Sequence, residues 1–393
     1  MGYPTIPKEE FIERQRKVQE MMVQNEIDLL VAYSDDGAVF GQEHARWLFN
    51  YQTHFEPTCI LIPVDGEPVL MTGVESEAYI YASSNCTNVK VVDEFVYSSH
   101  EFPFANIVKF EKQVEEVINS GSRDVKRIGF AGGDKMPYRL YKRFKDLFGD
   151  KPIINVDDLM IELRAVKTEN EIKVMEYAHH IAEKGIEAAI EMIAEGRTER
   201  EIAAEAEYVM RKLGSEGMGI DTIVGSGKEH TYPVIARTTH RKVEKNDLVL
   251  LTFAPRYEGY HAAIGRPIIV GKAKQEVEHA INTAINAQNA AKELLKPGIE
   301  GYKVDQAMRE VAEEAGLAKH VIYSGVHSIG ISEFEPPIMQ SSYKDVVKEN
   351  MVFAIDIPLF FNSWGGLRYE DGFHVTKDGA KPLQTLDNKI IRV

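Results

Sequence analysis

The sequence predicts an α+β protein of two domains, a smaller α/β domain over residues 1–156 and a larger domain over residues 157–393. Three observations support this division. The chain has 393 residues, which exceeds the roughly 100–200 residues of a typical domain. Helix and strand patterns alternate in the first part, whereas long helices follow Thr168. The second part also repeats itself, so we expect two αβ halves related by pseudo-two-fold symmetry, with helices backing a curved sheet.

The amino-terminal domain reads as alternating helices and strands. Residues 8–25 have the periodicity of an amphipathic helix, and the apolar run at 27–33 is typical of a buried strand. Val64-Asp65-Gly66 predicts a tight hairpin, because Asp-Gly favours the left-handed backbone that such a turn requires. The other strand and helix patterns of this domain lie at 58–63, 67–71, 127–131 and 138–148.

Two capping boxes mark helix starts in the larger domain. Thr168 with Glu171, and Thr198 with Glu201, have the spacing at which two side chains satisfy the free amide groups of a first helical turn. Long helices are therefore expected to begin after Thr168 and after Thr198.

An internal duplication is indicated by two glycine-bounded segments, 196–214 and 298–316, which have the same length. Apolar positions inside them also correspond, Ile202 with Val304 and Val209 with Val311. Strand patterns follow each segment, at 248–270 and at 351–376. Each half is thus expected to contain a long helix, a glycine-bounded helix and then strands.

Composition excludes several classes of partner. A net charge of -15 repels a phosphate backbone, so nucleic acid is not expected as a partner. The first residues lack a charged stretch followed by an apolar run, and no segment approaches the roughly 18 apolar residues of a membrane span. We therefore expect a cytoplasmic protein without a membrane partner. Cys59 and Cys86 are too few for a disulfide framework and too distant for a CxxC motif.

Four stretches of the larger domain resemble the motifs of a known family. They are Arg164–Ile172, Asp247–Leu250 continuing to Gly259-Tyr260, Val326–Gly330, and Met351–Phe353 continuing to Gly366–Asp371. In order and spacing they are similar to the pita-bread fold of creatinase, prolidase and methionine aminopeptidase. The resemblance covers about residues 160–380, and the amino-terminal domain resembles that of the creatinase and prolidase branch. It implies the pita-bread fold for residues 157–393.

The resemblance also implies which positions would bind metal. Family peptidases hold two divalent ions with two Asp, one His and two Glu, because hard cations prefer oxygen ligands. The corresponding positions here are Thr252, Ala263, His327, Asp356 and Glu370. Since Thr252 and Ala263 supply no carboxylate, we expect no cofactor and a metal-free pocket as in creatinase. A single divalent ion on His327, Asp356 and Glu370 is the alternative.

The three remaining polar positions are the predicted catalytic residues. The His327 ring is suited to polarising a carbonyl or moving protons near neutral pH, although a structural, hydrogen-bonded histidine is the alternative. Asp356 and Glu370 are expected on neighbouring strands that face one pocket. Without metals two close carboxylates repel, which raises the pKa of one of them into the range of a general acid.

Further residues are predicted to bind substrate. Glu335 lies in a Phe-Glu-Pro-Pro stretch that matches the family's His-Glu-x-Pro, with Phe334 in place of a histidine, and is a candidate to bind an ammonium or guanidinium group. Arg368 is a candidate to bind a carboxylate, with a structural ion pair as the alternative. Secondary candidates are His230, Tyr232, Tyr260 and His261, for which packing is the alternative.

Departures from creatinase bear on the substrate. Gly265 stands where creatinase has a glutamate, and the creatinase histidine would fall on Ile235 without a gap or on His230 with one.

Family dimers place amino-terminal residues over the partner's pocket, so the resemblance implies a homodimer. Phe55 and the aromatic stretch 47–51 are the candidates for that role, with a core loop of the amino-terminal domain as the alternative.

Our leading hypothesis from the sequence is a homodimeric, metal-independent hydrolase of a non-peptide or cyclic C–N bond. Its substrate would be a small guanidino, amidine or amide metabolite. Two alternatives remain: a metal-dependent Xaa-Pro dipeptidase or aminopeptidase with a rearranged site, and a non-catalytic pita-bread protein that only binds a ligand.

Overall fold

The chain divides between Arg164 and Ala165 into two units in a computed structural model that describes residues 2–98, 102–103 and 105–393. The first unit spans residues 6–164, and the second combines residues 165–393 with residues 2–5. The boundary expected from the sequence lay after residue 156. Helix α6 (Asp157–Ala165) accounts for the difference, because almost all of it belongs to the first unit.

The first unit is built on a six-stranded mixed sheet in the order β4-β3-β2-β1-β5-β6. Its strands are β1 (Leu29–Ser34), β2 (Thr58–Pro63), β3 (Val69–Thr72), β4 (Val89–Val91), β5 (Ile128–Ala131) and β6 (Ile153–Asn155). Its helices, besides α6, are α1 (Lys8–Gln24), α2 (Glu43–Phe49), α3 (Glu77–Ser83), the short 3-10 helix η1 (Asp93–Phe95), α4 (Phe110–Ile118) and α5 (Tyr138–Phe148). This unit has the alternating order that the sequence predicts.

The hairpin of the first unit begins its second strand later than expected. Strands β2 and β3 pair antiparallel on either side of the Asp65-Gly66 turn. The sequence suggested residues 67–71 for the second strand, whereas β3 starts at Val69. Pro68 explains the shift, because proline has no backbone N–H to donate to a neighbouring strand.

An aromatic cluster forms part of the core of the first unit. The Phe144 ring of α5 lies 4.9 Å from the Phe110 ring of α4 and 5.6 Å from the Phe130 ring of β5, edge to face in both cases. Edge-to-face contacts are favourable because the positive edge of one ring meets the negative face of the other. These contacts fasten α4 and α5 to the sheet.

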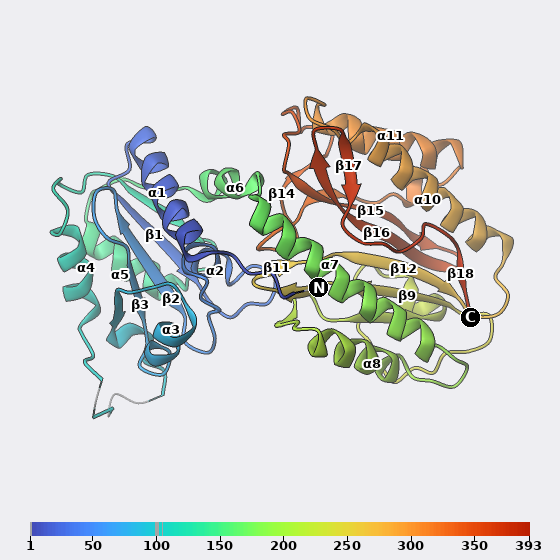
Figure 1. The fold of residues 1–393 in the computed structure, drawn as a ribbon, viewed down its shortest axis with the longest axis horizontal. Coiled ribbons are helices and arrows are strands. Elements are labelled where there is room, and N and C mark those ends of the chain that lie inside the picture. Colours follow the sequence, from blue (N-terminus) through green and yellow to red (C-terminus); the bar gives the residue numbers. More distant parts are fainter. Residues whose placement is uncertain (1, 99–101, 104) are drawn as a thin grey trace. The chain divides into compact units, whose positions relative to one another are not determined.

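The second unit consists of two halves, each with a pair of long helices followed by strands (Figure 1). The first half contains α7 (Glu169–Met192), α8 (Glu199–Lys212), β7 (Gly217–Met218), β8 (Ile223–Ser226), α9 (Gly227–Thr231), β9 (Leu248–Phe253), β10 (Pro255–Tyr257), β11 (Tyr260–His261) and β12 (Ile264–Ile269). The second half contains α10 (Gln275–Leu294), α11 (Gly301–Glu314), the 3-10 helix η2 (Ala318–His320), β13 (Val326–Ser328), β14 (Glu335–Ile338), β15 (Val352–Asn362), β16 (Gly365–Thr376), β17 (Gly379–Pro382) and β18 (Ile391–Arg392).

One large sheet joins the two halves. Its strands run in the order β14-β13-β15-β16-β12-β9-β8, with β17 beside β16 and β18 beside β12. Strands β11, β10 and β7 form a separate small sheet. Helix α7 packs on strands of the first half and α10 packs on β15 and β16 of the second (Figure 1). This is the curved, helix-backed sheet that the sequence predicts, so the expected fold class is confirmed.

The duplication extends to backbone geometry. Gly196 and Gly298 precede α8 and α11 with φ of 87° and 86°, a left-handed conformation that glycine adopts without a steric penalty. Their amide groups donate to equivalent carbonyls, Val243 O and Val347 O, both at 2.9 Å. The capping boxes at Thr168 and Thr198 are both present as predicted.

Two expectations from composition can be compared with the structure. In the part of the chain that the structure describes, no helix is both long and apolar enough to cross a membrane. Cys59 and Cys86 are free and buried, and burial raises the pKa of both thiols.

Candidate functional site

Three neighbouring strands bring His327, Asp356 and Glu370 together. His327 of β13 pairs with Ala354 of β15, and Asp356 of β15 stands directly opposite Glu370 of β16. Each of the three side chains is buried, with about 2% of its residue surface exposed. The β15–β16 hairpin therefore sets the two carboxyl groups side by side, and β13 adds the imidazole.

Arg368 lies between the two carboxyl groups. Its Nε is 3.0 Å from Asp356 Oδ2 and 3.9 Å from Glu370 Oε2, and its Nη2 donates to the Tyr323 hydroxyl at 2.8 Å. That hydroxyl donates in turn to Asp356 Oδ2 at 2.5 Å. Gly265 of β12, which pairs with Glu370, leaves room for the arginine, since a Cβ there would lie 2.8 Å from Arg368 Cγ.

His327 is held between a carboxylate and an aromatic ring. Its Nε2 lies 3.7 Å from Glu370 Oε1, which is long for a hydrogen bond but short enough for electrostatic attraction. Its Nδ1 is 3.1 Å from Ser328 O, and its ring centroid is 4.4 Å from that of Phe334. Phe334 stands where the family has a second histidine, and it packs against His327.

Two residues of this pocket escaped the reading of the sequence, Tyr323 and Glu333. Tyr323 lies in the loop before β13, and no motif distinguishes it. Glu333 is buried near His261, because a Cβ on Gly219 would lie 3.0 Å from Glu333 Cβ and 2.5 Å from His261 Cδ2. It lies in a run of bends before β14, so strand alternation gives no signal for it.

The pKa values of the titratable groups in the pocket are shifted in different directions. Burial raises the pKa of Asp356, and the charge of Arg368 offsets only part of that rise. Burial acts in the same direction on Glu370, but His327 and Arg368 outweigh it and lower the pKa of that carboxyl. Burial alone would lower the pKa of His327, yet Glu370 and Glu333 raise it. Glu370 therefore favours its ionised form, while Asp356 and His327 hold a proton more readily than usual.

Glu335 lies in a buried ion pair. Lys167, from the segment that precedes α7, places its Nζ 3.4 Å from Glu335 Oε1 and 3.1 Å from Ser328 Oγ. Both charged side chains are almost fully buried. Glu335 therefore has Lys167 as a cationic partner inside the protein. This is a structural ion pair and not an anchor that is open to a substrate cation.

Tyr260 and His261 occupy different surroundings. The Tyr260 hydroxyl donates to Glu171 Oε1 at 2.5 Å, at the capped start of α7. His261 places its Nδ1 3.2 Å from Gly330 O and has Glu333 as a neighbour. Tyr260 therefore fastens a helix end, and His261 lies beside the pocket.

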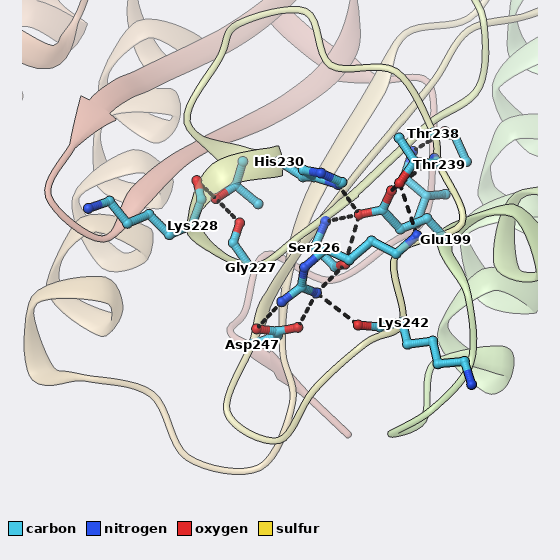
Figure 2. Close-up of polar contacts among 12 residues, drawn as sticks. Glu199, Ser226, Gly227, Lys228, His230, Thr238, Thr239, Lys242 and Asp247 are labelled. Atoms are coloured by element: carbon cyan, nitrogen blue, oxygen red, sulfur yellow. Dashed lines mark hydrogen bonds and ion pairs between the residues drawn. The ribbon is translucent and has the colours of Figure 1, made fainter.

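His230 and Tyr232 belong to the segment around α9. His230 Nδ1 lies 2.8 Å from Glu199 Oε1. Figure 2 shows this contact between the two labelled side chains. The Tyr232 ring meets the Phe361 ring edge to face at 5.2 Å. The contacts of these two side chains are with α8 and β15 rather than with His327, Asp356 or Glu370.

Phe55 belongs to the first unit. It is 52% exposed, its backbone is left-handed with φ of 62°, and its ring meets the Tyr97 ring at 6.2 Å. A bulky residue in that conformation is uncommon. In the stretch 47–51, by contrast, the large side chains of Trp47, Leu48, Phe49 and Tyr51 are buried in the core, which is the core-loop alternative.

A duplicated helix-backed sheet with a buried His–carboxylate–Arg pocket defines a hydrolase of the pita-bread class, and comparison with known proteins agrees. Residues 173–377 match Metallopeptidase family M24, and residues 14–166 match the Creatinase/Prolidase N-terminal domain. The chain belongs to this family.

Several relatives carry names that bear on activity. The chain is 30% identical to a Xaa-Pro dipeptidase of Pyrococcus furiosus, over 84% of this chain and 90% of the relative. The prolidase of Pyrococcus horikoshii shares its fold with a TM-score of 0.82 and 27% identity, over 96% of this chain and 100% of that one. An X-Pro aminopeptidase of Thermotoga maritima gives a TM-score of 0.82 and 25% identity, over 96% and 99%.

These relatives correct two expectations. The hypothesis of a creatinase-like hydrolase of guanidino, amidine or amide metabolites is wrong, because the relatives are named as Xaa-Pro dipeptidases and a prolidase. They favour the peptidase alternative instead. The expectation that no cofactor is needed is also overturned, because the matched family is one of metallopeptidases.

The residues of this pocket do not fit a two-metal centre. Thr252 and Ala263, at two of the family's ligand positions, supply only a hydroxyl and a methyl group, both buried. Arg368 brings a positive charge to within 3.0 Å of Asp356, which repels a cation. Among the described residues, no group of three or more His, Cys, Asp and Glu side chains is arranged to hold a metal ion.

Proposed function

We propose that the protein hydrolyses Xaa-Pro dipeptides or closely related short peptides with proline in the second position. One observation carries the proposal: relatives named as Xaa-Pro dipeptidases align over 84% of the chain. The match to the metallopeptidase family, over residues 173–377, includes His327, Asp356 and Glu370. Membership of the family supports a hydrolase. The assignment of Xaa-Pro dipeptides as substrates is the part that we propose.

Roles in this proposal follow from the charges of the pocket. Cleavage of a peptide bond needs a base that takes a proton from water and an acid that gives one to the departing nitrogen. Glu370, whose pKa is lowered, is assigned as the base, and His327 beside it shares the proton. Asp356, whose pKa is raised, is assigned as the acid. Arg368 orients Asp356 and counters the negative charge around it.

The proposal extends to assembly and location. We propose a homodimer in which the exposed Phe55 and Tyr97 pair covers the pocket of a second copy. A cytoplasmic location is consistent with two buried cysteines that form no disulfide. Gel filtration with light scattering tests the dimer, and Phe55→Ala in that dimer is expected to raise KM.

The test of activity is proline release from Ala-Pro and Met-Pro, with Ala-Ala as the non-proline control, before and after chelation and with divalent ions added back. Metal content of the purified protein is measured in parallel. We expect release from the proline dipeptides, and a loss of about a hundredfold or more in His327→Ala. His279→Ala, an exposed histidine of α10, is the control. No release under any metal condition would overturn the proposal.

A second candidate function is favoured by the lost ligand positions Thr252 and Ala263. A protein that binds such peptides without cleaving them needs the pocket but not a two-metal centre. Calorimetric titration with Ala-Pro separates the two, because binding without proline release supports the second candidate only.

A further inference from the structure

One buried carboxylate ties together both ends of the segment that follows β8. Glu199, in the first turn of α8, is fully buried. Its Oε1 accepts from Ser226 N and Ser226 Oγ, both at 2.8 Å, and its Oε2 accepts from Thr239 N at 2.9 Å and Thr239 Oγ1 at 2.7 Å. His230 Nδ1 adds a contact of 2.8 Å to Oε1 (Figure 2). The carboxylate therefore closes the base of the segment 226–239.

The hydrogen bonds of Glu199 are of the strong type. A carboxylate that accepts from several donors forms charge-assisted bonds, which are roughly twice as strong as neutral ones. Burial alone would raise the pKa of Glu199, but the donors of Thr239, Ser226 and His230 outweigh it and lower the pKa. The ionised carboxylate is thus the form that the protein holds.

Arg241 adds a second tie beside the first. Its Nη1 donates to Ser226 Oγ at 2.7 Å, to Lys242 O at 3.0 Å and to Asp247 Oδ2 at 2.6 Å. Ser226 is consequently held from both sides, by Glu199 and by Arg241. The start of α9, which follows Ser226 directly, has little freedom to move.

Helix α9 in turn covers the strand that carries the pocket residues. Gly366, Arg368 and Glu370 lie on one face of β16, because side chains alternate along a strand. A Cβ on Gly366 would lie 2.8 Å from Thr231 O and 2.6 Å from Phe360 Cδ1. The Arg368 guanidinium carbon is 5.9 Å from the centre of that Phe360 ring. A Cβ on Gly365 would also meet Thr231 and the Lys228 carbonyl. The end of α9 therefore lies over Gly365 and Gly366 at the start of β16, and Gly366 is one alternation along the strand from Arg368.

We propose that Glu199 is a positioning residue, which holds α9 in place as the end wall of the pocket. Its effect on dipeptide cleavage rests on the proposed function, whereas its effect on α9 does not. Because the wall contacts the substrate side of β16 and not the reacting groups, its loosening raises KM and leaves kcat nearly unchanged.

The experiment uses the full chain with Glu199→Gln, which keeps the side-chain volume but turns an amide N–H toward donor groups. Thr239→Val, a milder change, removes one donor at the same carboxylate. The control is His240→Ala, an exposed residue that directly follows the segment and contacts Arg200 instead of Glu199. Loss of a hydrogen bond to a charged group predicts a KM about tenfold higher for Glu199→Gln, with kcat within about twofold and no change in the control.

Two readouts are independent of activity. Hydrogen exchange of residues 227–239 is expected to become faster in Glu199→Gln. Trp364, which lines a cavity of about 190 Å³ together with Gly227 and Lys228 of α9, is expected to be quenched more easily by acrylamide in a Trp47→Phe background.

Each outcome has a defined meaning. Unchanged exchange and quenching in Glu199→Gln and Thr239→Val would overturn the inference, and so would an equal change in His240→Ala. Faster exchange with an unchanged KM would show that α9 is not a wall of the pocket and would overturn it too. If the unmodified protein cleaves no dipeptide, the proposed function fails, and exchange and quenching alone decide whether Glu199 holds α9.

Discussion

At the scale of residues, the pocket is organised by an arginine among acids. Arg368 contacts Asp356 and Glu370 and also donates a hydrogen bond to the Tyr323 hydroxyl. A buried carboxylate needs such partners, because an unpaired charge away from water is costly. Gly265 belongs to the same arrangement, since only a residue without a Cβ leaves space for the arginine stem.

Tyr323→Phe tests this arrangement directly. The change removes the hydroxyl that donates to Asp356 Oδ2 and accepts from Arg368. We expect kcat/KM for Ala-Pro to fall about tenfold and the free energy of unfolding to fall by about 1–2 kcal/mol, since a hydrogen bond to a buried charged group is lost. Steady-state kinetics and urea denaturation measure the two quantities. Tyr208→Phe, at an exposed tyrosine of α8, should change neither, and an active, equally stable Tyr323→Phe would contradict the role.

At the scale of elements, capped helices begin both long segments of the first half. Thr198 accepts from the Glu201 amide at 3.2 Å, and the Glu201 carboxylate accepts from the Thr198 amide at 2.8 Å. Because α8 starts at this cap, the cap also sets the position of Glu199 in its first turn. The capping box is visible in the sequence and fixes the position of Glu199, but it does not reveal the role of Glu199.

Thr198→Ala is expected to cost about 1 kcal/mol of stability, because the helix loses the acceptor of one free amide group. Thr198→Ser keeps the hydroxyl and should retain most of that stability. Urea denaturation of the full chain followed by circular dichroism measures both. Equal stability of the alanine and serine variants would show that the capping hydroxyl contributes nothing.

At the scale of the whole molecule, the first unit carries a buried charge cluster that links its stability to pH. Glu43 forms ion pairs with Arg164 at 2.9 Å and with Lys135 at 2.6 Å. Burial alone would raise the pKa of Glu43, but these charges outweigh it and lower the pKa to about 2. Burial lowers the pKa of the adjacent His44 to about 4.

Both shifts predict that the first unit loses stability in acid. The folded pKa of Glu43 lies below its ordinary value of 4.5, so its contribution is present above that pH and is lost as the pH falls toward about 2. For His44 the unfolded chain takes up the proton first, between its ordinary value of 6.5 and about 4, so acidification favours unfolding there as well. The loss from Glu43 is on the order of 3 kcal/mol.

The measurement is urea denaturation between pH 7 and pH 3, followed by the fluorescence of Trp47 in a Trp364→Phe background. Trp47 lies in α2 beside the cluster. Glu43→Gln should be less stable than the unmodified chain at pH 7 and should depend less on pH between about 4.5 and 3. A pH dependence that is identical in the two proteins would contradict the assignment.

Much of this architecture was accessible from the sequence because its signals are local. Apolar periodicity, the capping boxes at Thr168 and Thr198, and the repeated glycines each depend on residues close together along the chain. The expectation that Asp356 and Glu370 are neighbours rests instead on the family resemblance, and the two residues do pair in the β15–β16 hairpin. The substrate class was misjudged, because lost ligands at Thr252 and Ala263 were taken as evidence against peptidase chemistry.

The sequence by itself determined the helix starts and the duplicated fold, since periodicity, capping boxes and repeated glycines specify them, and its resemblance to a known family implied that His327, Asp356 and Glu370 share one site. Only the tertiary structure decided that Arg368 and Tyr323 both contact Asp356, that Glu333 joins the pocket and that Glu199 ties α9. The physical reason is that a side chain's partner depends on packing between segments distant in sequence. The partner of a buried charge is therefore the residue that this packing places next to it.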